Sequence, residues 1–352
     1  MTKATQSSLP LPLCPARAAV RLAGRLPAVL ASALSRWCPV NADGEHLAPE
    51  AWLASMSTAV MPGGDMSGAT IPAARRNLEI NSALVAEKTP ELSVVEDLLL
   101  DGPDGPIGAT RYRAETSSIG LVVFFHGGGF ALGSRATHDA YARRLALDTG
   151  ADVLSVEYRL APEHPFPAAV DDALAAWRFA VDAAPRWGLD PRRIVVAGDS
   201  AGGNLAAVVS QHVRGEDITP VLQLLIYPLT DLDRNGGSRD EFAVGYFLTA
   251  ERIDWFTDHY VPAGIDHTDP RLSPLYAADL AGQPRAHVVV AGFDPLRDEG
   301  LDYAAALERA GVPTTLQREG GLIHGFVNMV ATGPTPRRAV SRMHQAVVDA
   351  LG

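Results

Sequence analysis

The stretch at residues 194–205 constrains the fold of this chain more than any other. An apolar run at 194–197 stops at Gly198, and a helix-forming run begins at 205. Between them lies Gly-Asp-Ser-Ala-Gly, centred on Ser200, which matches the G-x-S-x-G pattern of a sharp turn between strand and helix. Strand and helix nearly collide at such a turn, so the residues two positions either side of the serine must be small. The sequence predicts a strand–turn–helix unit that presents the Ser200 hydroxyl at a helix N-terminus.

From residue 121 onward, strand patterns alternate with helical patterns. The run at 121–125 is apolar throughout, which is typical of a strand buried on both faces. Two further strands, 94–100 and 107–113, precede it around a turn rich in Gly and Asp. We therefore expect an α/β fold with a mostly parallel, eight-stranded sheet and helices on both faces. The other expected strands are 152–156, 194–197, 221–227, 286–291 and 314–318, and the expected helices are 138–149, 168–181, 201–214, 249–260, 299–310 and 337–350.

The domain organisation follows from where this alternation is absent. Residues 1–90 show no clear strands and carry two helical patches, 18–37 and 49–60. We predict that they form an N-terminal helical cap segment, followed by a core at 91–352. Within the core the pattern breaks at about 229–275, which predicts an insertion that folds over the carboxyl edge of the sheet as a second part of the cap.

Composition excludes several partners. The chain has 352 residues and a formal net charge of −11, which disfavours binding to nucleic acid and to anionic membranes. No run of apolar residues is long enough to span a bilayer, so we expect no stable membrane insertion. The two cysteines, Cys14 and Cys38, imply no disulfide framework, and a reduced, cytoplasmic location is the expectation.

The N-terminal region allows a second interpretation. Three arginines precede the apolar stretch at 26–34, and the stretch ends in a small-residue pattern. This resembles a weak secretory signal peptide. The apolar part is short and begins with a proline, so an amphipathic cap helix is the alternative.

Three residues with complementary chemistry follow strands of the predicted sheet. Ser200, Asp294 and His324 each lie just beyond the carboxyl end of a predicted strand, where reacting groups gather in parallel sheets. A serine hydroxyl is a poor nucleophile unless a histidine takes its proton, and the histidine needs a carboxylate to orient it. The order Ser, Asp, His is one of the known chain orders of such triads. We predict this catalytic triad, with His324 in a flexible, glycine-containing loop at 320–326.

Other residues compete for these roles. His164 also follows a strand, and Asp298 and Glu299 lie close to Asp294 in the sequence. Both acids fall at the start of a predicted helix, where the helix dipole favours carboxylates for structural reasons alone. We expect His126 to shape its loop, and the following histidines to be solvated or core residues: His138, His212, His259, His267, His287 and His344.

A glycine run after the strand at 121–125 offers backbone donors. The backbone N–H groups of Gly127 and Gly128, with that of Ala201, would bind the negative oxygen of a tetrahedral intermediate, forming an oxyanion hole. A plain glycine turn or a dinucleotide-binding loop is the alternative. The G-x-G-x-x-G spacing is absent, as are a His-Glu-x-x-His pattern and a cysteine cluster. We expect neither a cofactor nor a metal.

Together these segments resemble the hormone-sensitive-lipase-like group of α/β-hydrolases, the bacterial family IV esterases. The resemblance rests on residues 126–130, 158–169, 198–204, and 294–300 with 324–326. It implies an α/β-hydrolase fold with a helical cap over the site, built from the N-terminal segment and the insertion. It also implies cofactor-free hydrolysis of short- to medium-chain carboxylic esters through an acyl-enzyme. The residues that it implies are Ser200 as nucleophile, Asp294 as acid, His324 as base, and Gly127, Gly128 and Ala201 in the oxyanion hole.

Other functions fit the same motifs. The fold includes ligand-binding proteins that have lost a triad member, and amidases and lipases use the same triad. The expected partner is therefore a small-molecule ester, with a non-catalytic binding protein, an amidase or a lipase as alternatives. The last strand lies at a sheet edge, which allows edge pairing into a homodimer.

Overall fold

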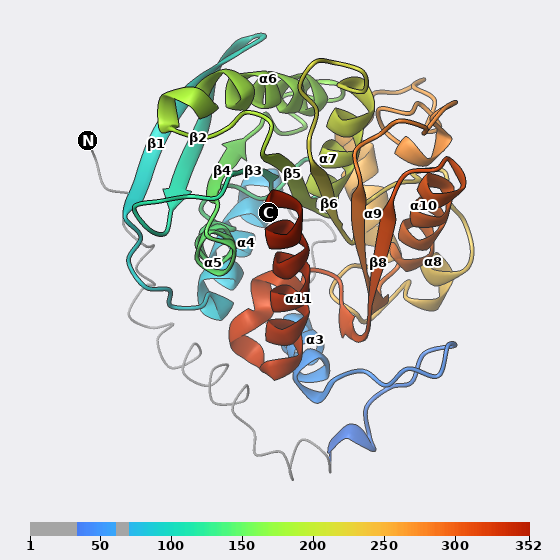
Figure 1. The fold of residues 1–352 in the computed structure, drawn as a ribbon. Helices are drawn as coiled ribbons and strands as arrows, with labels where there is room; N and C mark the ends of the chain where they lie inside the picture. Colours follow the sequence, from blue (N-terminus) through green and yellow to red (C-terminus); the bar gives the residue numbers. More distant parts are fainter. Residues whose placement is uncertain (1–33, 61–69) are drawn as a thin grey trace.

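The computed structural model describes residues 34–60 and 70–352, which form one eight-stranded sheet between layers of helices (Figure 1). The strand order is β1-β2-β4-β3-β5-β6-β7-β8. The pairs β1–β2 and β2–β4 are antiparallel, and the remaining pairs are parallel, so the predicted α/β fold with a mostly parallel sheet is confirmed. The strands are β1 (Val94–Gly102), β2 (Gly105–Arg113), β3 (Leu121–Phe125), β4 (Asp152–Glu157), β5 (Ile194–Asp199), β6 (Leu222–Ile226), β7 (Ala286–Phe293) and β8 (Thr314–Ile323).

Two hydrophobic clusters cover the two faces of the sheet. Successive side chains of a strand point to opposite faces, so Val123 packs in one cluster and Phe124 in the other. The first cluster includes residues of α6 (Ala168–Ala183), α7 (Ala201–His212) and α10 (Arg297–Arg309). The second includes residues of α5 (Asp139–Thr149) and α11 (Pro334–Leu351). This explains the apolar run at β3, where all five residues are fully buried.

Strand β8 is longer than predicted. We expected a strand at 314–318 and a flexible glycine loop after it, but β8 continues through Gly320 and Gly321 to Ile323. Its pairing with β7 extends to Phe293 opposite Ile323, across an irregularity between Ala291 and Phe293. A Cβ on Gly292 would overlap the backbone of Gly320, so this glycine serves a close approach between two strands. The expectation of a flexible loop before His324 is wrong.

Strand β8 lies at the edge of the sheet, as predicted. Part of this edge is covered by the N-terminal segment, because the Ala48 amide donates to the Gly321 carbonyl at 2.8 Å. Arg318 of the same strand pairs with Asp43 and Glu45. The homodimer through this edge stays a prediction.

The two segments that were predicted to form a cap contain helices among the described residues. The helix predicted at 49–60 is α3 (Pro49–Val60), and a second helix, α4 (Ile71–Val85), was not predicted. The patch at 18–37, apart from its last four residues, and nearly all of the signal-like stretch lie outside the described residues. The insertion at 229–275 contains three short elements: α8 (Ser238–Glu241), α9 (Ala250–Tyr260) and η3 (Pro274–Tyr276). The side chain of Thr249 caps α9 by accepting from the Arg252 amide.

Candidate active site

Ser200 sits at the sharp turn between β5 and α7. Its backbone has φ 57° and ψ −118°, a strained conformation for a residue with a side chain. A Cβ on Gly198 would overlap the backbone of Gly202, and a Cβ on Gly202 would overlap the Phe125 carbonyl. Small residues at both positions therefore let the helix leave the strand at once, which leaves Ser200 at the first turn of α7.

The structure brings the three predicted residues into one hydrogen-bonded chain. His324 Nε2 lies 3.0 Å from Ser200 Oγ, and His324 Nδ1 lies 2.7 Å from Asp294 Oδ2. A carboxylate oxygen only accepts, so the Nδ1 proton is donated to Asp294, and Nε2 is left to accept from the serine hydroxyl. Asp294 is fully buried, and its other oxygen accepts from the Leu296 amide at 2.8 Å. The arrangement can take the proton of Ser200 and stabilise the imidazolium that forms.

The two competing carboxylates, those of Asp298 and Glu299, bind groups other than His324. Asp298 accepts from Arg297 Nε and from the Ser238 amide, each at 2.8 Å. Glu299 is fully buried, and its carboxylate binds Arg239 at 2.8 Å and the Thr230 amide at 2.8 Å. These two residues hold the start of the insertion against α10, away from His324. His164 is exposed in the turn after β4.

The glycine loop after β3 differs from the prediction in one donor. The Gly127 amide donates to Asp199 Oδ1 at 2.8 Å inside the protein, so its single N–H is not available to an oxyanion. The predicted role of Gly127 is therefore wrong. The amides of Gly128, Gly129 and Ala201 donate to no other group of the described residues, and all three residues line the same cavity as Ser200. These three amides are the donors that the geometry leaves for a negative oxygen.

His126 shapes the loop from within, the role expected of it. Its ring is fully buried, and Nδ1 lies 2.9 Å from the Gly127 carbonyl. The ring stacks on Tyr158 at a centroid distance of 4.3 Å, and the Tyr158 hydroxyl donates to the His126 carbonyl at 2.7 Å. Burial, together with the nearby His138, lowers the pKa of His126 to about 4. The imidazole is therefore neutral at neutral pH.

A second cluster beside the triad was missed by sequence reasoning. His138, expected to be a solvated or core residue, places Nε2 at 3.3 Å from Asp199 Oδ1 and at 3.1 Å from Asn328 Nδ2. Burial raises the pKa of Asp199, but the interaction with His138 and the Gly127 hydrogen bond outweigh it, so the pKa lies below its usual value. The only available signal was that Asp199 precedes the serine within the motif.

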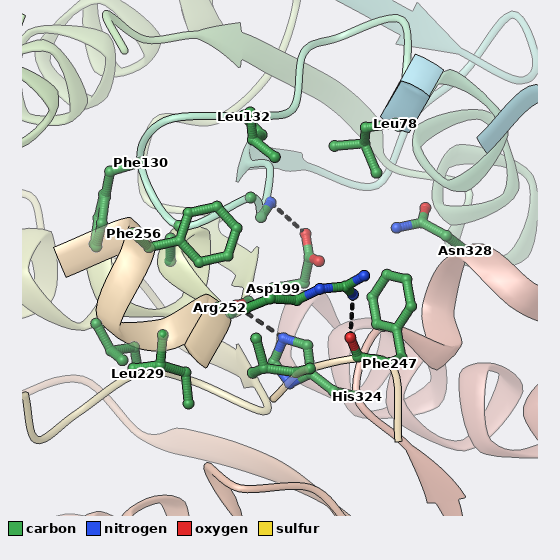
Figure 2. A pocket seen from close by; sticks show the side chains of 18 of the residues that line it. Leu78, Phe130, Leu132, Asp199, Leu229, Phe247, Arg252, Phe256, His324 and Asn328 are labelled. Carbon is green, nitrogen blue, oxygen red and sulfur yellow. Dashed lines mark hydrogen bonds between the residues drawn. The ribbon is translucent and has the colours of Figure 1, made fainter. Parts of the chain in front are cut away.

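Ser200, His324, Asp199 and His138 line a cavity of about 180 Å³. Figure 2 shows Phe130, Phe256 and Leu229 on one side of His324, and Leu78 and Asn328 on the other. Arg252 of α9 reaches across the cavity and donates to the Phe247 carbonyl. The walls come from α4, the glycine loop, α9, and the short helix η4 (Phe326–Thr332) that follows His324. The N-terminal segment and the insertion therefore both contribute to the cavity.

Within residues 34–60 and 70–352, no group of three or more His, Cys, Asp or Glu side chains is placed to hold a metal ion. No helix in that part of the chain combines the length and apolar character needed to cross a bilayer.

Comparison with known proteins places the chain among hydrolases. Residues 122–328 match a family described as alpha/beta hydrolase fold. The carboxylic ester hydrolase LipN of Mycobacterium tuberculosis is 48% identical over 253 residues, covering 69% of this chain and 67% of that protein. Ethyl acetate hydrolase of Pseudomonas putida is 40% identical over 263 residues, covering 73% of this chain and 83% of that protein.

Solved structures agree with the sequence relatives. The ester-hydrolase EH1AB1 from the metagenome of Lake Arreo, complexed with a derivative of bipyridine phosphonate, superposes with a TM-score of 0.82 at 41% identity, covering 86% of this chain and 98% of that one. A Pyrobaculum calidifontis esterase superposes with a TM-score of 0.79 at 39% identity, with the same coverage of the two chains.

Proposed function

This chain belongs to the alpha/beta hydrolase fold family and, within it, to the hormone-sensitive-lipase-like group, and from that membership we propose that it is a serine carboxylesterase acting on short- to medium-chain esters. The observation that carries the proposal is the unbroken chain of contacts from Ser200 Oγ through His324 to Asp294. Each member is buried or half-buried and each bond has hydrogen-bonding length, so the nucleophile, its base and the orienting acid are already aligned.

In the proposed reaction, Ser200 Oγ attacks the ester carbonyl while His324 Nε2 takes its proton. Asp294 holds the Nδ1 proton and stabilises the imidazolium. The carbonyl oxygen becomes negative and accepts from the amides of Gly128, Gly129 and Ala201. The bond to the alcohol oxygen then breaks, and the alcohol leaves with the proton from His324. Water repeats the sequence on the acyl-enzyme and releases the acid.

The first experiment separates an enzyme from a non-catalytic binding protein of the same fold. A fluorophosphonate probe reacts with an activated serine and forms a stable covalent adduct. We expect labelling of the wild type at Ser200, located by peptide mass spectrometry, and none of Ser200→Ala. An unlabelled wild type would favour the binding protein.

The second experiment separates esterases from amidases. We expect turnover of p-nitrophenyl acetate and butanoate, with little hydrolysis of the matched p-nitroanilides. An anilide rate comparable to the ester rate would make the protein an amidase. This comparison uses the same acyl groups, so the leaving group alone is varied.

A further inference from the structure

The glycine loop, which carries two of the three oxyanion donors, has a strained backbone. Gly128, Gly129 and Phe130 have φ values of 123°, 59° and 59°, angles that residues with a side chain rarely adopt. Such a conformation at Phe130 persists only where the surrounding structure holds it. Its carbonyl accepts from the Ala161 amide at 2.9 Å, and the Leu132 amide donates to the Gly128 carbonyl at 2.9 Å. The position of the donor amides therefore depends on the contacts that fix the far end of this loop.

Arg75 of α4 makes two such contacts. Its Nε donates to the Ala131 carbonyl at 3.0 Å, and its Nη2 donates to the Ala161 carbonyl at 2.9 Å. Because the Ala161 amide also binds the Phe130 carbonyl, the guanidinium bridges two segments that already contact each other. The same guanidinium pairs with the Glu163 carboxylate at 2.9 Å and 2.7 Å. Four hydrogen bonds from one side chain therefore join α4, the glycine loop and the turn after β4.

The contacts to the carbonyls and to the carboxylate differ in what they hold. The Glu163 side chain is 52% exposed, and an exposed ion pair contributes little to stability. The two carbonyls belong to partly buried backbone, and the planar guanidinium presents its N–H groups at a fixed spacing. We expect the carbonyl contacts, and not the ion pair, to restrain the loop.

The helix that carries Arg75 also forms one wall of the cavity. Ala74 is almost fully buried and lines the cavity together with Leu78. Figure 2 shows Leu78 of α4 and Leu132 of the glycine loop among the side chains that line it. Arg75 is not among the described residues of this lining, so an effect of Arg75 on the reaction would pass through the loop and not through contact with substrate.

We propose that Arg75 is a positioning residue: by binding the carbonyls of Ala131 and Ala161, it keeps the amides of the glycine loop at the place where the oxyanion forms. The inference rests on the proposed esterase function and adds to it a residue of the N-terminal segment. Donors that are already in place stabilise the developing charge without reorganisation. Their displacement lowers kcat and leaves substrate binding nearly unchanged, because the negative charge exists only in the transition state and the intermediate.

The first test replaces Arg75 by methionine, which keeps much of the side-chain length and none of the donors. Loss of a whole oxyanion donor costs on the order of 10²-fold, so for displaced donors we expect Arg75→Met to lower kcat on p-nitrophenyl butanoate by about tenfold, with KM changed by less than about twofold. The matched control is Arg76→Met, at the exposed next residue of the same helix, which should keep the wild-type kcat. Glu163→Gln leaves both carbonyl contacts in place and should keep kcat within about twofold.

The second test measures inhibition by propyl trifluoromethyl ketone. Ser200 Oγ adds to its carbonyl carbon, His324 takes the serine proton, and the carbonyl oxygen becomes an oxyanion. For Arg75→Met, the inhibition constant should rise by the same factor as kcat/KM falls, because both quantities depend on stabilisation of this oxygen. Arg75→Lys retains the charge, but its single ammonium cannot span both carbonyls, so it should show a smaller loss in the same direction.

Thermal unfolding of every variant separates positioning from stability. A less stable Arg75→Met that keeps its kcat and its affinity for the ketone would overturn the proposal, and Arg75→Lys decides in the same way where the methionine variant does not fold. An equal loss of kcat in Arg76→Met or in Glu163→Gln would also overturn it, because neither change removes a contact to the two carbonyls. A wild type that hydrolyses no ester and does not bind the ketone would instead refute the proposed function itself.

Discussion

The Asp199 carboxylate accepts a hydrogen bond from the Gly127 amide at 2.8 Å, and this bond ties the turn that carries Ser200 to the glycine loop opposite it. Asp199 is almost fully buried, and it also contacts His138. The position of the Gly128 and Gly129 amides relative to the serine therefore depends on a carboxylate that takes no part in the proposed chemistry.

We expect Asp199→Ala to lower kcat far more than it raises KM. Without the carboxylate, the Gly127 amide is buried unpaired and the loop shifts, and a misplaced oxyanion donor costs on the order of 10²-fold in kcat. Asp199→Asn keeps an oxygen that accepts from Gly127 and should lose much less. Steady-state kinetics on p-nitrophenyl butanoate, with thermal unfolding followed by circular dichroism, check this. A variant that is less stable but keeps its kcat would show a structural role only.

Ser200→Ala should abolish ester hydrolysis and leave the fold intact. The serine is the only member of the proposed triad that forms a covalent bond, and loss of a nucleophile of this type costs on the order of 10⁶-fold in kcat. Alanine also removes little volume at the turn. Turnover and the circular dichroism spectrum are the measurements, and retention of more than about a tenth of the activity would exclude Ser200 as the nucleophile.

Asp294→Asn should reduce kcat far more than Asp298→Asn. An amide at 294 can present a donor where His324 Nδ1–H needs an acceptor, which costs up to ~10⁴-fold in rate in a well-studied triad. Asp298 instead binds Arg297 and the Ser238 amide, so its variant should act on stability. Kinetics and thermal unfolding of both variants decide the assignment, and the opposite ranking in kcat would move the acid role away from Asp294.

The free energy of unfolding should decrease as the pH falls from about 6.5 to about 4. Burial, together with the nearby His138, lowers the pKa of His126 from 6.5 to about 4. Between these values only the unfolded chain binds a proton at this residue, so folding is progressively disfavoured as the pH falls, and below about 4 this effect is complete. The expected loss from His126 is about 3 kcal/mol.

The control for this pH dependence is His126→Gln, in which the group cannot titrate. Urea unfolding of both proteins at several pH values between 4 and 7 gives, for each protein, the slope of the free energy of unfolding against pH. The variant should have the smaller slope, although it will be less stable at neutral pH because the stacking on Tyr158 is altered. Equal slopes would show that folding does not lower the pKa of His126.

The acyl half of the preferred ester substrates should have roughly two to eight carbons. The enzyme should show no activation at a lipid–water interface. Each CH₂ buried against the apolar residues of the cavity contributes about 0.8 kcal/mol until the space is filled. The cavity of about 180 Å³ is lined by α4, α9 and η4. Measurement of kcat/KM from p-nitrophenyl acetate to palmitate, and then on emulsified triolein, tests this. A maximum at palmitate, or a rise in rate above the solubility limit, would make the protein a lipase.

The alternation of strands and helices along the chain and the turn at Ser200 were predictable from sequence because their determinants are local. The apolar run Leu121–Phe125 is a strand with the predicted bounds, and the small residues at Gly198 and Gly202 are needed by contacts within the same turn. Alternating strands and helices then define which strand ends share an edge, so Ser200, Asp294 and His324 could be expected at one place. The distances between their atoms were beyond this reasoning.

Only the tertiary structure decided which groups near Ser200 are paired. The Gly127 amide resembles its glycine neighbours in sequence, but a carboxylate 72 residues away occupies it. In the same way, glycines 320 and 321 indicate a loop locally, whereas β7 pairs with Glu319 before them and with Ile323 after them, which keeps them within one strand. A backbone N–H or a glycine carries no information about its partner, because that partner comes from a distant segment that is brought near only when the sheet and its helices pack together.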